Sequence, residues 1–287
     1  MVMIFSSVEH DQPDDPGDFR LRQFPARAVG KIDFYSPDRS CVITSDSSGA
    51  VAQGEVKFPN GMKAMMDIFP DACGDLSGLA ALEADDLSRI SFYDCQLEDF
   101  QLKHLQHLTG LSCLDLKGTN VSEFGLFFLQ SLTGLHTLIL DATPTNDEGL
   151  RYLPTTNLWN LYLKRTQISD DGIHIIKEAP ALRCLHLPAT ITDKGIENLA
   201  GSGVVSLDLS DCTKLTANCF AHLKQLVQLT EVDLPDQITD ADLEQLSQLN
   251  IKLQTIGFSP QSSTTKEARE QLQANGIADR IMVANRC

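Results

Sequence analysis

A short apolar pattern, L-x-x-L-x-L, recurs along the chain and constrains its fold more than any other feature. Successive copies start 22 to 25 residues apart. A fixed period of this length is typical of a fold built by stacking similar units, because no single unit can bury its own apolar face. The copies start at Leu87, Leu111, Leu135, Leu158, Leu182, Val204, Leu229 and Leu253.

Each unit combines the apolar spacing of a strand with that of a helix. The last two apolar residues of the pattern are two positions apart, so both point to the same face of a short strand. A Ser or Thr followed by Asp, as in 168–173 and 191–196, is then a helix N-cap signal. Runs such as 125–132 and 242–249 place apolar residues at helical spacing. We therefore predict one strand, one turn and one helix per unit.

The units resemble leucine-rich repeats, whose period is roughly 20–29 residues. In place of the usual Asn, the ninth position carries a thiol or hydroxyl, which can hydrogen-bond the backbone of the turn. Together with the I-S/T-D-x-G-I form of 168–173 and 191–196, this is similar to the ribonuclease-inhibitor-like and cysteine-containing subclasses and their bacterial relatives. The resemblance implies a bacterial source and an α/β solenoid, right-handed and curved, with a parallel sheet on the concave face and helices on the convex face. The ninth-position residues are Cys95, Thr119, Thr143, Thr166, Thr190 and Cys212.

The two ends of such a stack expose apolar faces and open sheet edges, which require caps. Upstream of the repeats, a turn signal at 59–61 joins two alternating apolar runs and predicts a β-hairpin. A second pair of runs flanks 36–39, so we expect a small antiparallel cap. The predicted domains are a flexible acidic segment (1–27), an antiparallel β cap (28–62), leucine-rich repeats (63–276, with a degenerate first unit at 63–86) and a C-terminal capping strand (277–287).

The composition argues against several classes of partner. The chain has 39 acidic and 23 basic side chains, a formal charge of −16, and it lacks the basic footprint that nucleic-acid binding requires. It has no apolar run of about 18 residues and no basic segment at its start, so we expect neither membrane association nor export. The eight cysteines include no C-x-x-C pair, and we expect reduced thiols in a cytoplasmic protein.

The sequence offers little for catalysis. It contains no G-x-S-x-G, H-E-x-x-H, P-loop or G-x-G-x-x-G motif, so we expect no enzymatic activity and no cofactor. His104 and His107 share a helix face by their spacing, but without a third ligand they predict no metal site. One glycine recurs per unit, and we interpret this series as scaffold. It consists of Gly125, Gly149, Gly172 and Gly195.

The repeat register indicates which side chains face a partner. The third, fifth and seventh residues of each unit project from the concave sheet, in columns that run along the stack. In the middle units these columns bring aromatic and basic side chains together, and in the later units they gather five carboxylates. Exposed aromatic side chains favour a binding site, and a carboxylate field favours a basic partner. The predicted partner-binding residues are Tyr93, Lys117, Ile139, Tyr162, Lys164, Arg165, His186, Asp208, Asp211, Glu231, Asp233 and Asp236.

These observations favour a non-enzymatic module that binds a protein partner through its concave sheet. By resemblance, ribonuclease-inhibitor-like repeats recognise proteins. An alternative is a substrate-receptor or adaptor subunit of a larger complex, similar to ubiquitin-ligase adaptors, but this would need a helical docking motif where the N-terminal segment favours strands. An enzyme with a site in the N-terminal cap is a weaker hypothesis, because that segment offers only His10 and Cys41 as chemical groups.

Overall fold

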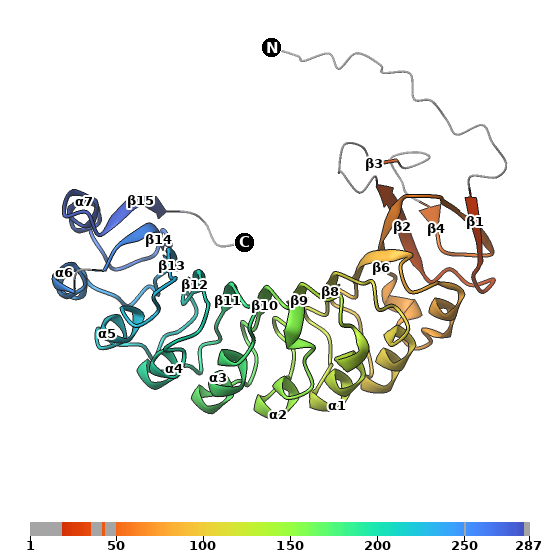
Figure 1. Cartoon of the computed structure of the whole chain (residues 1–287), viewed down its shortest axis with the longest axis horizontal. Helices are drawn as coiled ribbons and strands as arrows, with labels where there is room; N and C mark the ends of the chain where they lie inside the picture. The colour runs from red at the N-terminus through yellow and green to blue at the C-terminus, as the bar shows by residue number, and fades with distance from the viewer. Residues whose placement is uncertain (1–18, 36–41, 44–49, 250, 284–287) are drawn as a thin grey trace, which may run out of the picture.

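The computed structural model describes residues 19–35, 42–43, 50–249 and 251–283 of the 287-residue chain. These residues form an arc whose inner, concave side is lined by parallel strands and whose outer, convex side carries the helices (Figure 1). The expected leucine-rich-repeat solenoid is thus confirmed. Within the described ranges, no helix combines the length and the apolar character of a membrane span.

One sheet runs the length of the arc. In the described part of the chain it has 13 strands. Twelve follow one another from β15 back to β6 and then β2 (Gly30–Tyr35) and β3 (Val42–Ile43), and the thirteenth, β4 (Ala50–Val51), also pairs with β2. From β7 to β14 each strand pairs in parallel with the next in one register, so equivalent positions of all units lie side by side. The strands of the repeats are β6 (Lys63–Ile68), β7 (Leu87–Ser91), β8 (Cys113–Asp115), β9 (Thr137–Ile139), β10 (Asn160–Tyr162), β11 (Cys184–His186), β12 (Ser206–Asp208), β13 (Glu231–Asp233), β14 (Leu253–Phe258) and β15 (Ala278–Val283).

Short helices cover the convex side. The early units use 3-10 helices in place of, or beside, α-helices, and longer α-helices begin with α3. The α-helices are α1 (Glu123–Leu126), α2 (Asp147–Leu150), α3 (Asp170–Lys177), α4 (Asp193–Asn198), α5 (Cys219–Leu223), α6 (Asp240–Gln248) and α7 (Lys266–Ala274). The 3-10 helices are η1 (Pro70–Ala72), η2 (Ser77–Ala81), η3 (Asp99–Leu105), η4 (Phe127–Ser131) and η5 (Thr155–Asn157).

The core lies between the sheet and the helices and repeats once per unit. Leucines of the L-x-x-L-x-L pattern, such as Leu114 and Leu116, are fully buried in it. Three ninth-position hydroxyls close their own turns, as expected: Thr119 donates to the carbonyl of Leu116 at 2.7 Å, and Thr143 and Thr166 repeat this bond in the next two units. The Thr190 hydroxyl instead donates to the carbonyl of Ile168 in the preceding unit. Each buried hydroxyl therefore satisfies a backbone acceptor at the end of a strand.

An aspartate of one unit is clamped onto the helix start of the next. The carboxylate of Asp170 accepts hydrogen bonds from the backbone N–H and the hydroxyl of Thr192, at 2.9 and 2.6 Å. The recurring glycine makes room for this carboxylate, because a Cβ at Gly195 would lie 2.5 Å from Oδ1 of Asp170. The S/T-D-x-G motif thus caps its own helix and also joins neighbouring units. The same clamp joins Asp99 to Ser122, Asp147 to Ser169, Asp193 to Thr216 and Asp240 to Thr265.

The N-terminal cap is antiparallel, as predicted, but its connectivity differs. Strand β2 (Gly30–Tyr35) runs antiparallel to β6 and extends the main sheet, with β3 (Val42–Ile43) and β4 (Ala50–Val51) paired to it. Strand β5 (Glu55–Pro59) instead pairs with β1 (Phe19–Gln23) in a separate two-stranded sheet. The hairpin predicted around 59–61 is therefore wrong. The turn forms, but both edges of β6 are occupied by β2 and β7, which leaves none for β5.

An ion cluster ties β1 to the start of the repeats. The carboxylate of Asp86 is fully buried and lies 2.5 Å from Nε of Arg22 and 2.9 Å from a guanidinium nitrogen of Arg20. The hydrogen bond to Asp86 raises the pKa of Arg22 above its ordinary value. The flexible segment expected over 1–27 therefore does not extend into β1, and residues 1–18 lie outside the described part of the chain.

Two cysteines of adjacent units are joined. Cys73 and Cys95 form a buried disulfide, with Cα atoms 6.2 Å apart. The expectation of reduced thiols is wrong for this pair. Their separation of 22 residues is close to one repeat, which places them on neighbouring turns. The cysteine argument for a cytoplasmic location loses these two residues.

Candidate binding site on the concave sheet

The fifth positions of successive units form a column across the concave sheet. Tyr162 on β10 lies in register between Ile139 on β9 and His186 on β11. The tyrosine and imidazole rings are in contact, with centroids 4.3 Å apart and planes 38° from each other. All three side chains are half-buried, so the middle of the column presents an ordered aromatic and apolar surface to solvent.

Asp208 organises the basic side chains beside this surface. One of its carboxylate oxygens lies 2.6 Å from Nζ of Lys164 and 3.1 Å from Nδ1 of His186, while the other accepts the backbone N–H of Ser210 at 2.8 Å. The Lys164 ammonium also donates to the Ser210 hydroxyl at 2.9 Å. From the sequence, Asp208 was expected in a separate acidic group. That separation is wrong, because the long Lys164 side chain reaches across β11 to it.

The charge state of His186 follows from this arrangement. Burial disfavours the charged imidazole, but hydrogen bonds and electrostatic attraction from Asp208 and Cys184 together outweigh burial and raise the pKa of His186 to about 9. Burial likewise opposes ionisation of Asp208, yet hydrogen bonds from His186, Lys164 and Ser210 hold its pKa well below the usual range. At neutral pH the cluster therefore contains two cations and one carboxylate.

The predicted residues toward the N-terminal end form a smaller group. Tyr93 is 55% exposed, and Nζ of Lys117 lies 5.8 Å from the centroid of its ring, within the range of a cation–π contact. Arg165 is exposed on the turn after β10 in a left-handed conformation, φ 59°. It therefore lies at the rim of the concave face and not on the strand itself.

The acidic residues of the later units remain close in register. Glu231 and Asp233 are exposed on β13, two positions apart on the same face. Asp211 and Asp236 are half-buried on the turns that follow the strands, and the Asp236 carboxylate is hydrogen-bonded to the Ser259 hydroxyl. Without Asp208, the acidic group thus comprises four carboxylates.

Three further exposed aromatic residues lie outside the predicted partner-binding set. Trp159, at the second position of its unit, is 54% exposed at the N-terminal end of β10. Phe124 and Phe100 are exposed on the convex side, and they occupy the same position of adjacent units, 24 residues apart. The sequence contained a signal for this pair. The two phenylalanines occupy a repeat position outside the apolar pattern, and residues at such positions are expected to face solvent.

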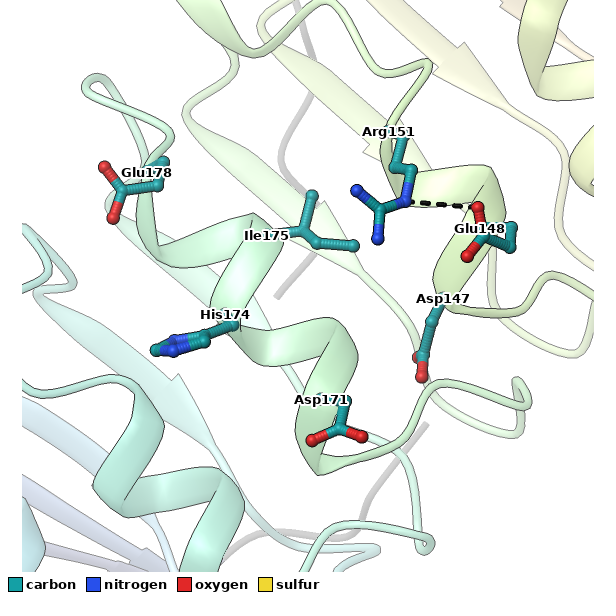
Figure 2. A pocket seen from close by; sticks show the side chains of 7 residues that line it. All are labelled: Asp147, Glu148, Arg151, Asp171, His174, Ile175 and Glu178. Carbon is teal, nitrogen blue, oxygen red and sulfur yellow. Dashed lines mark hydrogen bonds and ion pairs between the residues drawn. The ribbon is translucent and has the colours of Figure 1, made fainter.

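The convex side also has a hollow of about 590 Å³ between α2 and α3 (Figure 2). Carboxylates dominate its lining, and the Glu148 carboxylate pairs with Arg151 at 3.1 Å. Asp147 is already held by Ser169 in the clamp between units. Among the residues that the structure describes, no three His, Cys, Asp or Glu side chains are grouped to hold a metal ion.

Three of the free cysteines that the structure describes have thiols that are harder to ionise than usual. Burial raises the pKa of Cys113, and it raises the pKa of Cys212 and Cys219 further. A reactive thiol requires the opposite shift. His10 and Cys41, the groups on which an N-terminal enzyme site would depend, lie outside the described residues.

Comparison with known proteins returns structural similarity only. No protein-family model and no curated protein matches the chain. The yeast Rad7 and Elc1 complex contains a chain that is 17% identical, with a TM-score of 0.45, over 66% of this chain and 60% of that one. The internalin inlF of Listeria monocytogenes is 19% identical, with a TM-score of 0.40, over 74% of this chain and 71% of that one. Internalin C2 of the same organism is 18% identical, with a TM-score of 0.43, over 72% of this chain and 84% of that one. The present chain thus spans 60% of the matched chain of the Rad7 and Elc1 complex.

Proposed function

We propose that the chain is a non-enzymatic scaffold whose concave sheet binds a protein partner around Tyr162 and His186. The observation that carries this proposal is the contact of these two rings, beside the ion cluster of Lys164 and Asp208. Side chains that are held in place before binding lose little conformational entropy when a partner arrives. Tyrosine is also among the residue types that most often anchor interfaces.

The charges along the sheet suggest the polarity of the partner. Glu231 and Asp233 are exposed at the C-terminal end of the column, which favours a basic surface at that end of the partner. Lys164 and His186 are paired with Asp208, so they add hydrogen-bonding groups and a single net positive charge. We further propose that the repeats belong to the ribonuclease-inhibitor-like or cysteine-containing subclass, on the strength of their ninth-position residues.

A pull-down from native lysate tests the proposal. The bait is the full chain, compared with a variant carrying Tyr162→Ala and Arg165→Ala, and captured proteins are identified by mass spectrometry. We expect the double variant to lose the partner while keeping the circular dichroism of the wild type. Phe124→Ala removes an exposed aromatic side chain from the convex side and should keep the partner. Retention by the double variant would place the site elsewhere.

A further inference from the structure

A second surface, separate from the tyrosine and histidine pair, surrounds the only tryptophan of the chain. The backbone around Trp159 is fixed by hydrogen bonds to both neighbouring units. Its N–H donates to the carbonyl of His136 at 2.8 Å, and its own carbonyl accepts from Arg183 and Cys184 at 2.9 Å. The indole meets the His136 ring edge to face, with centroids 5.0 Å apart. A large aromatic side chain is thus held firmly while 54% of it faces solvent.

Trp159 lies between two hollows and lines both of them. The hollow on the sheet side has a volume of about 640 Å³ and includes Arg89 and His136. The hollow on the other side has a volume of about 500 Å³ and includes Pro180 and Arg183. Binding hot spots concentrate where an aromatic or apolar side chain of one protein fills a pocket of the other. An exposed tryptophan flanked by two hollows is therefore suited to contact an apolar side chain of a partner.

The charge of this surface is opposite to that of the molecule. The chain carries a formal charge of −16, yet no Asp or Glu is among the described residues that line the two hollows. Arg183 forms no ion pair with any described residue, and carbonyl oxygens of Leu182 and Pro180 orient one of its guanidinium nitrogens. Arg89 is 3.5 Å from Asp115, but its side chain remains 42% exposed while that of Asp115 is 11% exposed.

The distance between the two arginines sets the length of a ligand. Arg89 lies on β7 and Arg183 immediately precedes β11, four strands away. At about 4.8 Å per strand, the two positions are about 19 Å apart, which an extended peptide covers with about six residues. The overall negative charge opposes an acidic ligand only weakly at contact, because charges beyond about 8 Å are screened at physiological ionic strength.

We propose that the surface formed by Arg89, His136, Trp159, Pro180 and Arg183 binds an extended acidic peptide segment of a partner. An apolar side chain of that segment packs against the indole, and its carboxylates meet Arg89 and Arg183. This surface is distinct from the site around Tyr162 and His186, and it favours a ligand of the opposite charge to that favoured by Glu231 and Asp233.

Selection from a phage library of random dodecapeptides tests the inference, with the full chain as the target. We expect enriched peptides to be net acidic and to contain an aromatic or large aliphatic residue. Their binding should change the fluorescence of the wild-type protein, because Trp159 is its only tryptophan. Trp159→Ala, and the pair Arg89→Ala with Arg183→Ala, should each weaken binding of a selected peptide by about tenfold or more.

Two controls separate this surface from others. Phe124→Ala, which removes an exposed aromatic from the convex side, should bind the selected peptides as the wild type does. Tyr162→Ala should also bind them, because Tyr162 is not part of this surface. The peptide result therefore does not depend on whether a partner binds around Tyr162 and His186. The inference is overturned if no enriched peptide changes the fluorescence of Trp159, if the peptides that do so are neutral or basic, if Trp159→Ala binds them with unchanged affinity, or if Tyr162→Ala abolishes their binding.

Discussion

Replacing Asp208 by Asn should destabilise the protein in a pH-dependent manner. The substitution keeps the size of the side chain but removes the charge that His186 and Lys164 share, at 3.1 and 2.6 Å. In the variant, burial of His186 is no longer opposed by Asp208, which makes the largest contribution to raising its pKa. We therefore expect the pKa of His186 to fall from about 9 to its ordinary range or lower.

The size of the effect follows from the pKa of His186. A rise from the ordinary value of 6.5 to about 9 corresponds to about 3 kcal/mol of stability, since each pKa unit is worth about 1.4 kcal/mol. The folded protein holds the proton more tightly than the unfolded chain. The contribution is therefore complete below the unfolded pKa of 6.5 and is lost as pH rises through about 9.

Urea unfolding of the wild type and of Asp208→Asn, at about pH 6 and about pH 10, measures this difference. We expect the loss of unfolding free energy to be about 3 kcal/mol larger at the lower pH. NMR titration of the His186 ring gives the pKa directly. Asp171→Asn, which removes an exposed carboxylate from α3, should have little effect at either pH. An equal cost of Asp208→Asn at both pH values, or a wild-type pKa near 6.5, would refute the reasoning.

Three further predictions concern stability and thiol chemistry. Asp86→Ala should cost about 3 kcal/mol in urea unfolding, because it removes the buried carboxylate that Arg20 and Arg22 share and leaves Arg22 only the exposed Glu83; an unchanged midpoint would contradict the role of this cluster. Gly195→Ala should cost about 1–3 kcal/mol, since the added Cβ meets Asp170, whereas Gly74→Ala, where a Cβ meets nothing within 4 Å, should leave the midpoint unchanged. Cys212 and Cys219 should resist alkylation in the native protein and half-buried Cys184 should react before them, as peptide mass spectrometry would show; early labelling of Cys212 would argue against its burial.

The repeat period predicted the fold and the main columns of the candidate site because strands in register convert sequence spacing into spatial order. Ile139, Tyr162 and His186 are neighbours on the sheet for this reason alone. The same logic identified the N-caps, such as Ser169 and Thr192, from the S/T-D signal. The repeat period did not show that each aspartate also binds the helix start of the next unit, because that contact depends on the distance between stacked units.

Features that break the period could not be predicted. The pairing of Arg22 with Asp86 spans 64 residues between the cap and the repeats, and no local pattern marks it. The link from Lys164 to Asp208 skips a strand, because it depends on the length of one side chain. The second position of the repeat places Trp159 at the edge of its strand, but the apolar pattern does not show how much of the side chain faces solvent, since that depends on packing against neighbouring units.

Site-specific photo-crosslinking tests the central claim, that the concave sheet is the binding face, most directly. A benzoylphenylalanine replaces Tyr162 in one protein and Phe124, which is 70% exposed on the convex side, in another. After irradiation in native lysate, we predict that the probe at position 162 forms a covalent adduct with a protein partner and that the probe at position 124 does not. Adducts of the same partner from position 124, with none from position 162, would contradict the account.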